Sequence, residues 1–335
     1  MLDFAPKANG YVKMRLVVVD VGGTHIRFAI AKLSDCHPIE LEEQMVMRTA
    51  EYADLVSAWG AFAEKVGAPL PRDAAIAVAC PTEASTLRLT NNRWVTVKES
   101  LPRDLGVDRV LVLNDFVAVG HAVLCATEEH LKHICGPDIP LQSAGIVSVV
   151  GPGTGLGVAQ IIPSLGKANV VATEAGHIGF APADDLDDAI LARLRRRYGR
   201  VSVERVVAGP SLVDIYEVIA EQQNVQPQPM TDKALWPLAL AGTDQLATVA
   251  LGRFCLNLGR VTGDIALAQG AGSVVIAGGI GLRLANHLKD SNFSDGFISK
   301  GRFHQRMSAL PVKLMTTPQP GLIGAAHFFG SKYNH

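Results

Sequence analysis

Two glycine-rich segments of the same design recur in this chain, and each places a glycine turn between two apolar runs. They are Val17-Val18-Val19-Asp20-Val21-Gly22-Gly23-Thr24-His25-Ile26-Arg27-Phe28 and Val147-Ser148-Val149-Val150-Gly151-Pro152-Gly153-Thr154-Gly155-Leu156-Gly157-Val158. Valine-rich runs on both sides of a short glycine turn are typical of β-hairpins. When the copies are overlaid, Thr24 falls on Thr154 and Asp20 falls on Val150.

Glycine turns of this kind suit the binding of phosphate. Glycine has no Cβ, so its backbone can approach a ligand closely. The N–H groups of such a turn form a concave set that accommodates an anion. Thr24 and Thr154 each add a hydroxyl group. The repeat therefore predicts two related lobes with a nucleotide bound between them.

Size and composition limit the alternatives. A chain of 335 residues, 48% hydrophobic and 19% charged, fits two folded domains. The formal net charge of −1 gives no general attraction to nucleic acid or to an anionic membrane, and we expect neither partner. Residues 1–14 show no secretory signal pattern. The five cysteines are scattered, which predicts buried, reduced thiols and a cytoplasmic location.

The order of the apolar runs predicts an α/β fold. Strands are expected over Leu16–Val19, Phe28–Leu33, Ala74–Cys80, Val107–Leu113, Ala144–Val150, Val158–Ile162, Ser273–Ala277 and Val312–Met315. Helices are expected over Phe116–Cys125, Asp184–Arg197, Ser202–Gln222, Thr243–Gln269 and Gly321–Phe329, the last returning to the first lobe. Gln223–Pro237 is expected to form a loop because it contains several prolines.

Asp20 is expected at a strand end, just before the first glycine turn. A carboxylate there can hold Mg²⁺, directly or through water, beside the phosphates of a nucleotide. The alternative is a turn aspartate that bonds to its own backbone. Because Val150 replaces it in the second copy, we expect one metal carboxylate in the two lobes.

Asn114 and Asp115 directly follow an apolar strand. The carboxyl ends of strands in open α/β sheets face the ligand crevice. A carboxylate there can accept the proton of an attacking hydroxyl, which the neighbouring amide can orient. The alternative is a helix cap for the segment that begins at Phe116.

Glu174-Ala175-Gly176-His177 places a carboxylate and an imidazole three positions apart. Gly176 disfavours a helix, so a loop that offers polar groups to a polyhydroxylated ligand is favoured over a metal site. Glu204 lies near the expected start of a helix. Its position alone favours a structural role, as an acid in the first turn that the helix dipole stabilises.

Two further clusters are interpreted as structural. The segment from His130 to Cys135 has the composition of a metal site, but its spacing matches no zinc pattern, and we expect a solvated segment. The basic run from Arg193 to Arg200 follows four aspartates, an order that the helix dipole favours, so we expect a solvated helix.

Taken together, these motifs resemble those of the bacterial glucokinases, in the hexokinase/actin-like superfamily. The resemblance rests on Asp20-Val21-Gly22-Gly23-Thr24, Leu113-Asn114-Asp115-Phe116, Gly151-Pro152-Gly153-Thr154-Gly155-Leu156-Gly157, Glu174-Ala175-Gly176-His177, Ser202-Val203-Glu204-Arg205 and Ile276-Ala277-Gly278-Gly279. These matches come in the family's order and span nearly the whole chain. The one departure from the commonest pattern is Ala175, where glycine is frequent.

The resemblance implies two ribonuclease-H-like lobes with mixed sheets flanked by helices and a cleft between them. The small lobe would be residues 1–126 plus 319–335, and the large lobe residues 127–318. Asp115 would be the catalytic base, and the sugar would be held by Asn114, Asp115, Glu174, His177 and Glu204. The nucleotide would be bound by Val19, Asp20, Val21, Gly22, Gly23, Thr24, Gly151, Gly153, Thr154, Gly155, Gly278 and Gly279.

The resemblance further implies phosphorylation of D-glucose by ATP and Mg²⁺ to glucose 6-phosphate, the first step of glycolysis, in a homodimer. Two alternatives remain open. One is a kinase for another hexose or an N-acetylhexosamine, and the other is a non-catalytic regulator that binds sugar and nucleotide. A DNA-binding regulator is disfavoured because the cysteine-rich zinc motif of the related repressors does not follow His177.

Overall fold

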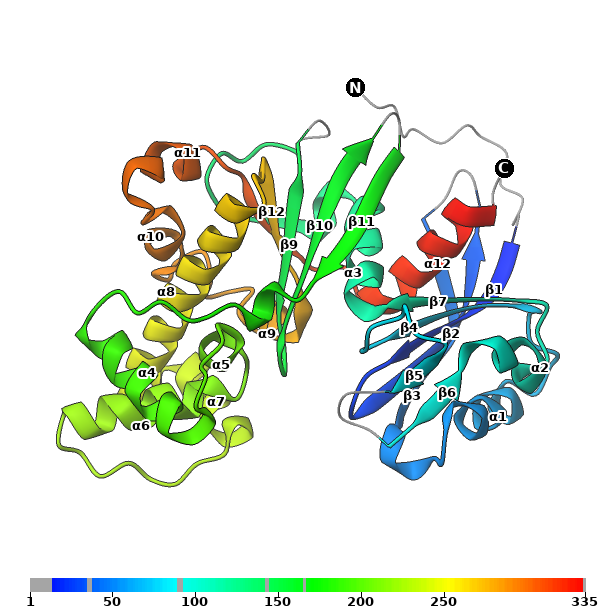
Figure 1. Ribbon diagram of the computed structural model, residues 1–335, viewed down its shortest axis with the longest axis horizontal. Coiled ribbons are helices and arrows are strands. Elements are labelled where there is room, and N and C mark those ends of the chain that lie inside the picture. Colours follow the sequence, from blue (N-terminus) through cyan, green and yellow to red (C-terminus); the bar gives the residue numbers. More distant parts are fainter. Residues whose placement is uncertain (1–13, 35–37, 89–92, 142–144, 165–166, 334–335) are drawn as a thin grey trace. The chain divides into compact units, whose positions relative to one another are not determined.

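The computed structural model describes residues 14–34, 38–88, 93–141, 145–164 and 167–333. The chain divides into two compact units (Figure 1), Met1–Ala126 with Thr317–His335 and then Thr127–Thr316. Each unit is built around one mixed sheet. Ala144, the first residue of the strand expected over Ala144–Val150, and the cysteine at position 36 lie outside the described residues.

The sheet of the first unit has the order β3-β2-β1-β4-β7. Its strands are β1 (Met14–Val21), β2 (His25–Leu33), β3 (Glu40–Arg48), β4 (Asp73–Val78) and β7 (Arg109–Asn114). The first three strands pair antiparallel, whereas β4 is parallel to both β1 and β7. A two-stranded ribbon, β5 (Thr86–Arg88) with β6 (Val95–Val97), lies outside this sheet.

Helices cover both faces of this sheet because β1 alternates its side chains between them. Val17 and Val19 pack in a core that includes residues of α1, whereas Leu16 and Val18 pack with residues of α3 and α12. The helices are α1 (Leu55–Val66), α2 (Leu101–Leu105), α3 (Asp115–Leu124) and α12 (Pro320–Tyr333), with 3-10 turns η1 (Thr49–Glu51) and η2 (Lys98–Ser100). The last helix does belong to the first unit, as expected, and crosses α3 where Gly324 meets the backbone of Ala118.

The sheet of the second unit has the order β11-β10-β9-β12-β13-β8. Its strands are β8 (Leu131–Cys135), β9 (Val147–Pro152), β10 (Leu156–Ser164), β11 (Lys167–Thr173), β12 (Ser273–Ile276) and β13 (Val312–Met315). Apart from the added edge strand β8, the order and directions repeat those of the first sheet. This repetition confirms the predicted pair of ribonuclease-H-like lobes.

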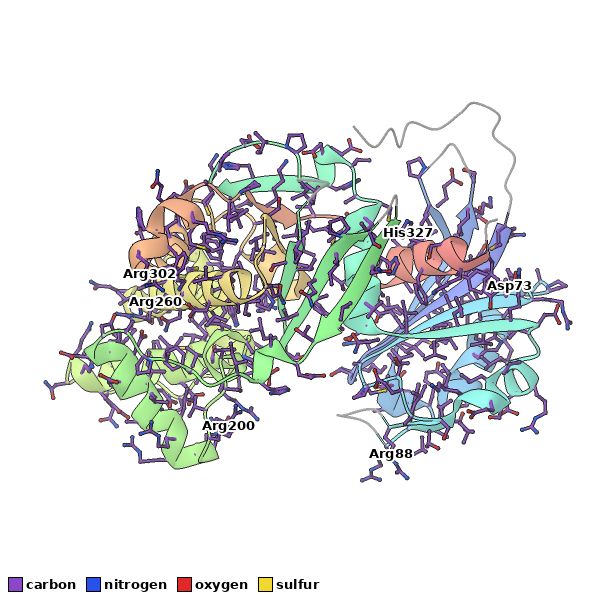
Figure 2. The ribbon with its side chains drawn as sticks, turned by 45° about the horizontal axis from the view of Figure 1, so that its top comes forward. Asp73, Arg88, Arg200, Arg260, Arg302 and His327 are labelled. Atoms are coloured by element: carbon purple, nitrogen blue, oxygen red, sulfur yellow. The ribbon has the colours of Figure 1, made fainter. Side chains whose placement is uncertain are left out.

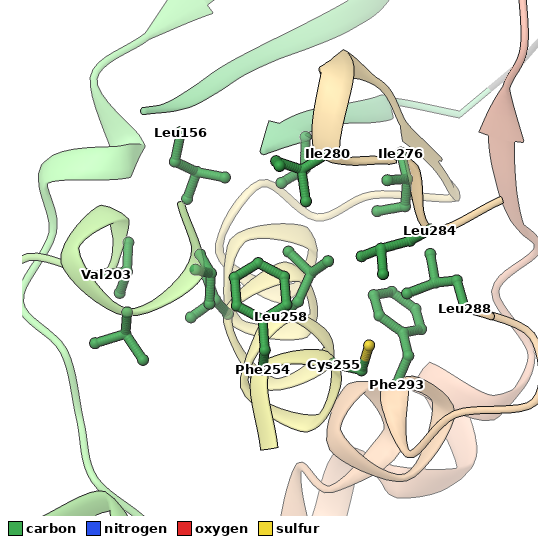
Figure 3. Close-up of a cluster of buried hydrophobic side chains, with 14 of the residues drawn as sticks. Leu156, Val203, Phe254, Cys255, Leu258, Ile276, Ile280, Leu284, Leu288 and Phe293 are labelled. Carbon is green, nitrogen blue, oxygen red and sulfur yellow. The ribbon is translucent and has the colours of Figure 1, made fainter. Parts of the chain in front are cut away.

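The helices of the second unit surround the long helix α8, whose Phe254 and Leu258 are fully buried (Figure 3). They are α4 (Asp185–Tyr198), α5 (Glu204–Val207), α6 (Ser211–Gln222), α7 (Asp232–Ala241), α8 (Gln245–Ala268), α9 (Gly278–Arg283), α10 (Phe293–Ile298) and α11 (His304–Ser308). The 3-10 turns are η3 (Glu128–His130), η4 (Ala175–His177) and η5 (Gly301–Phe303).

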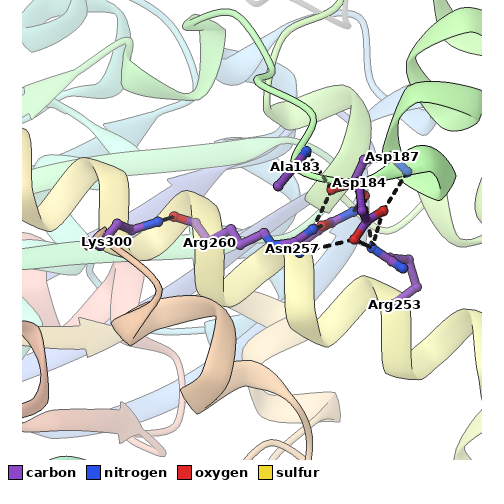
Figure 4. Close-up of polar contacts among 7 residues, drawn as sticks. All are labelled: Ala183, Asp184, Asp187, Arg253, Asn257, Arg260 and Lys300. Carbon is purple, nitrogen blue, oxygen red and sulfur yellow. Dashed lines mark hydrogen bonds and ion pairs between the residues drawn. The ribbon is translucent and has the colours of Figure 1, made fainter. Parts of the chain in front are cut away.

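A buried ionic cluster joins α4 to α8 (Figure 4). Asp187 is fully buried and is paired with Arg253 and Arg260, and Asn257 Nδ2 donates to it at 2.9 Å. Burial raises the pKa of the neighbouring Asp184, but Arg253, the backbone N–H of Asp187 and Arg260 outweigh that effect and hold it at about 2. The cluster fixes α4, which leads directly to the segment that carries Glu204.

Two expectations about helices in the second unit were wrong. Ser202–Gln222 is not one helix, because it breaks at Ala208, Gly209 and Pro210, and a proline restricts the residue before it. Gln223–Pro237 is not a continuous loop, because α7 begins at Asp232 and contains Pro237. Burial of Trp236, whose indole N–H donates to the Gly209 carbonyl at 2.9 Å, offsets the cost of that proline.

The two clusters interpreted as structural have more order than expected. Residues from Leu131 to Cys135 form strand β8, in which Leu131 and Ile134 are buried, rather than a solvated segment. The basic run does lie on a helix, but Arg193 is not simply solvated. It forms ion pairs with Asp214, Glu217 and Glu221 of α6.

Candidate functional site

Three adjacent strands bring the first set of candidate residues to one edge of the first sheet. In the parallel register, Asp20 of β1 pairs with Ala77 of β4, and Val78 of β4 pairs with Asn114 of β7. The carboxyl ends of the three strands therefore coincide. Because neighbouring strands lie about 4.8 Å apart, β1 and β7 are about 10 Å apart at this edge. The structure thus brings Asp20 and Asn114 to the same edge.

Asp20 is closely packed on two sides. Arg27, its partner across β1 and β2, donates to Asp20 Oδ2 at 3.3 Å. On the other side, a Cβ added at Gly321, near the start of α12, would lie 2.8 Å from the Asp20 carboxylate. Burial raises the pKa of Asp20, and Arg27 only partly opposes that effect. The protein therefore does not fully stabilise the negative charge of the Asp20 carboxylate. A bound cation could supply the missing stabilisation.

The first glycine turn is tied to the end of β3. Within the turn, Gly22 N donates to the carbonyl of His25 at 2.9 Å. Thr49 holds it from outside, since its Oγ1 donates to the Gly23 carbonyl at 2.9 Å and its N–H donates to the Thr24 carbonyl at 3.1 Å. Thr24 itself is exposed. The role of Thr49 was missed by sequence reasoning, because no local pattern links it to a turn 26 residues away.

Asn114 and Asp115 form the start of α3, and both interpretations of the pair contribute. Asn114 Oδ1 accepts from the N–H groups of Phe116 at 2.8 Å and Val117 at 3.3 Å, which is a helix cap. Its Nδ2 donates to the Cys80 carbonyl at 3.4 Å. The cap fixes the backbone that presents Asp115, the first residue of the helix. The pKa of the Cys80 thiol is raised by burial and by the charge of Asp115, so the two side chains are close.

The second glycine turn is held by α5. Glu204 Oε2 accepts from the N–H of Leu156 at 2.9 Å, and a Cβ added at Gly155 would lie only 2.5 Å from that oxygen. Just beyond the helix, Gly209 N donates to the Gly153 carbonyl at 2.7 Å. Glu204 therefore lies against the turn, and a side chain at Gly155 would displace its carboxylate.

Gly278 and Gly279 begin α9 behind the same turn. Gly278 has φ +79°, and a Cβ there would lie 2.7 Å from the Pro152 carbonyl oxygen. Both features require glycine at this position. Gly279 is exposed. The structure therefore packs Gly278, and with it the start of α9, against the Gly151–Gly157 segment.

Glu174 directly precedes a single 3-10 turn, η4, and His177 is the last residue of that turn, so the pair does not lie on a longer helix. His177 Nε2 and Glu174 Oε2 lie 3.7 Å apart, and both side chains are mostly exposed. Arg200, labelled in Figure 2, donates to the His177 carbonyl at 2.7 Å. A Cβ at Gly176 would lie 2.2 Å from the Leu156 carbonyl oxygen, so the segment packs directly on the end of the second turn.

A short backbone pairing joins this segment to Glu204. Gly179 forms a β-bridge with Ser202, and Val203 N donates to the Ile178 carbonyl at 2.9 Å. The pairing brings His177 and Glu204 to the same side of the second turn. All three polar residues predicted to hold sugar from this unit are therefore gathered around one residue, Leu156.

Other classes of site find no support in the part of the chain that the structure describes. No three His, Cys, Asp or Glu side chains among those residues are placed to hold a metal ion by themselves. None of the described helices is both long and apolar enough to cross a membrane. Four cysteines of the described residues are free thiols. Cys80 and Cys255 are buried as expected, but the expectation of burial was wrong for Cys135, which is partly exposed, and for Cys125, which is exposed.

Comparison with known proteins gives one consistent result. The family model described as Glucokinase matches residues 17–332. A curated glucokinase from Zymomonas mobilis is 52% identical over 96% of this chain and 99% of its own length. The crystal structure of a glucokinase from an Antarctic psychrotroph is 30% identical, with a TM-score of 0.83 over 96% of this chain and 100% of that one.

A more distant structure shares the fold alone. It is a ROK family glucokinase from Streptomyces griseus, crystallised in complex with glucose and AMPPNP. It is 19% identical, with a TM-score of 0.61 over 94% of this chain and 99% of that one. The resemblance to glucokinases that the motifs indicated is thus found again at the level of whole sequences and of the fold.

Proposed function

The chain belongs to the glucokinase family, and we propose that Asp115 is its general base in the ATP-dependent phosphorylation of glucose to glucose 6-phosphate. The observation that carries this assignment is the position of Asp115 at the carboxyl edge of the first sheet, two strands from Asp20. The cap made by Asn114 fixes that position.

The chemistry required of Asp115 is modest. Phosphoryl transfer passes through a loose transition state, so the attacking hydroxyl needs little activation early in the reaction. A carboxylate that accepts the proton of the sugar's 6-hydroxyl late in the transfer is sufficient. Asn114 can orient the sugar only through its Nδ2 group, because its Oδ1 already caps α3. Asp115 therefore has the chemical role and Asn114 the positioning role.

The remaining sugar contacts are assigned to the second unit. Glu174 and His177 are exposed and lie together, and Glu204 has a second carboxylate oxygen beyond the one that accepts from Leu156. Carboxylate and imidazole groups on a fixed backbone can pair with several hydroxyls of one hexose. We assign these three residues, with Asn114 and Asp115, to the sugar site.

The phosphates are assigned to the two glycine turns and the adenosine to Gly278 and Gly279. The assignment is supported by the open backbone at Gly153 and Gly279, where an added Cβ would meet no described atom within 4 Å. Asp20 fits a Mg²⁺ ion held by one carboxylate together with waters and the phosphates themselves. When bound, Mg²⁺ neutralises charge on the phosphates. Arg27 and the closely packed Gly321 keep the Asp20 carboxylate in place.

Measurement of ADP release with glucose and ATP tests the role of Asp115. Asp115→Ala is expected to lower turnover by about 10²-fold or more, the usual contribution of general base catalysis, with a smaller effect on glucose binding. Asp185, the exposed first residue of α4, provides the matched control, since it has the same place in a different helix. Near-normal turnover in Asp115→Ala would remove Asp115 from this role.

Two broader assignments belong to the same proposal. A panel of hexoses and N-acetylhexosamines at equal concentration tests whether glucose is the preferred acceptor. A homodimer in the cytoplasm is what the family resemblance implies, and light scattering of the purified chain tests its oligomeric state.

A further inference from the structure

Leu156 is the point at which three parts of the second unit meet. Its N–H donates to Glu204 Oε2 at 2.9 Å, and its carbonyl oxygen lies against Gly176. Its side chain is buried in the hydrophobic core of this unit (Figure 3). The residue directly follows the turn assigned to phosphate. Both polar segments assigned to sugar are therefore attached to the end of that turn.

The contact between Glu204 and the turn is tight. A Cβ added at Gly155 would lie 2.5 Å from Glu204 Oε2, so a side chain there would displace the carboxylate from this position. The turn is also held on its other side, where Gly209, just past the end of α5, donates to the Gly153 carbonyl. Movement of the Glu204 carboxylate away from this position would break its hydrogen bond with the N–H of Leu156, at the end of the turn.

We propose that Glu204 is a positioning residue for the phosphate-binding turn and that it links sugar binding to nucleotide affinity inside the second unit. This inference rests on the proposed function, because it takes Glu204 to bind a sugar hydroxyl. One carboxylate oxygen holds Leu156 and the other accepts from the sugar. A bound sugar then fixes the Glu204 side chain, and with it the turn.

The sign of the effect follows from conformational entropy. A turn that the sugar has already ordered loses less freedom when the phosphates bind, so the second ligand binds more tightly than it would alone. Because coupling is reciprocal, the nucleotide strengthens sugar binding by the same factor. Couplings of this kind are about 5- to 150-fold in affinity.

The test is calorimetric titration of the wild-type chain with AMPPNP and Mg²⁺, with and without saturating glucose. The measured quantity is the ratio of the two dissociation constants. For the wild-type chain, glucose is expected to tighten AMPPNP binding by about 5-fold or more. A ratio of one, in a chain that binds glucose and phosphorylates it, would overturn the inference and leave the proposed function intact. Absence of glucose binding and turnover would instead remove the proposed function.

Two glycine variants of the same turn distinguish loss of the contact with Glu204 from a general disturbance of the turn. Gly155→Ala places a methyl group against Glu204 Oε2 and is expected to reduce the ratio to about one. Gly153→Ala adds the same methyl group where no described atom lies within 4 Å. Whatever that change does to nucleotide affinity itself, the ratio should keep its wild-type value. Retention of the wild-type ratio in Gly155→Ala would contradict the role of Glu204.

Glu204→Gln supplies a second test that does not depend on the folding of the glycine variants. The amide oxygen of glutamine can still accept from Leu156, so the ratio is expected to persist while glucose binds less tightly. Glu204→Ala loses both contacts, and its ratio is expected to fall to about one. Thermal unfolding of each variant reports whether it is folded. Equal ratios in Glu204→Ala and the wild-type chain would refute the proposal.

Discussion

The two glycine turns begin from nearly the same sequence pattern but are held in different ways. The first lies between Val21 and Ile26, which pair across the hairpin, and the second lies between Pro152 and Leu156. The second turn is therefore one residue shorter, although the strands on both sides match. The two copies therefore share the pairing of their strands but differ in the length of the turn between them.

The partners of the turns explain their different chemistry. The first turn has Asp20 in its own strand and is tied by Thr49. The second has Val150 at the matching position, and its acid, Glu204, comes from α5. The proposed function gives the repeated hairpin two roles, one beside a cation and one beside the sugar. The predictions below test that division.

The largest effect is expected from Asp20→Asn. Asparagine keeps the size of the side chain and an acceptor for Arg27, but it removes the negative charge that suits Mg²⁺. Turnover should fall by about 10²- to 10³-fold, the scale seen when one charge-stabilising group is lost. Titration with Mn²⁺, followed by electron paramagnetic resonance, should show weaker binding of the ion in the presence of AMPPNP. Unchanged ion binding would contradict the assignment of Asp20.

Placing an acid in the second turn should not reproduce the first. Val150 is fully buried, and no Arg27 equivalent faces it, because Val150 pairs with Val158. Val150→Asp is therefore expected to lower the free energy of unfolding by about 3 kcal/mol or more, the cost of an uncompensated buried charge. Urea denaturation measures this loss, and Val150→Ala separates it from the loss of packing alone.

Gly176→Ala tests how closely the sugar segment depends on the second turn. The added Cβ would lie 2.2 Å from a backbone oxygen that cannot move easily. We expect a loss of about 3 kcal/mol in stability, at the upper end for overpacking, together with weaker glucose binding. Gly179→Ala is the control, since no described atom lies within 4 Å of its added Cβ. Equal behaviour of the two variants would count against the packing at Leu156.

The two units should also differ in their response to acid. In the first unit, His121 of α3 and His327 of α12 have their Nδ1 atoms 3.0 Å apart, and Figure 2 labels His327. Burial, His327 and Lys332 lower the pKa of His121 to about 3. Because the folded pKa lies below the unfolded value of 6.5, stability is lost as the pH falls below 6.5.

At pH 5, protonation linked to His121 lowers the free energy of unfolding by about 2 kcal/mol. In the second unit, the pKa of Asp184 is lowered to about 2, so its contribution persists until the pH falls below 3.8. Hydrogen exchange at pH 5 should therefore show α3 and α12 losing protection before α4 and α8. The raised pKa of Asp20 acts in the opposite direction within the first unit. A His121→Gln/His327→Gln double variant isolates the histidines and should show a weaker response to acid.

The smallest effect is expected from Thr49→Val, which removes the hydrogen bond to the Gly23 carbonyl while keeping the shape of the side chain. One such bond contributes about 1 kcal/mol. The Michaelis constant for ATP should rise by less than about 10-fold, with little change in turnover. If Thr49→Val raised the Michaelis constant for ATP by more than Glu204→Ala does, the first turn would depend more on its outside partner than the second turn does.

Most of the fold could be predicted from the sequence because its signals are local. The two hairpins, the strands ending at Val78 and Asn114, and helices α3, α4 and α8 follow from runs of apolar residues and from turn residues. The errors arose where distant contacts outweighed local preference. Burial of Trp236 keeps a proline within α7, and pairing with β13 makes a strand of β8.

The sequence by itself determined the chemical groups of the site, since carboxylates, glycines and a histidine can be recognised without coordinates. The tertiary structure alone decided their partners. It set Gly321 against Asp20, Thr49 against the first turn, and Glu204 and Gly176 against Leu156. The physical reason is that hydrogen bonds and steric contacts act over a few ångströms in space, whereas these partners lie from 20 to 301 positions apart along the chain.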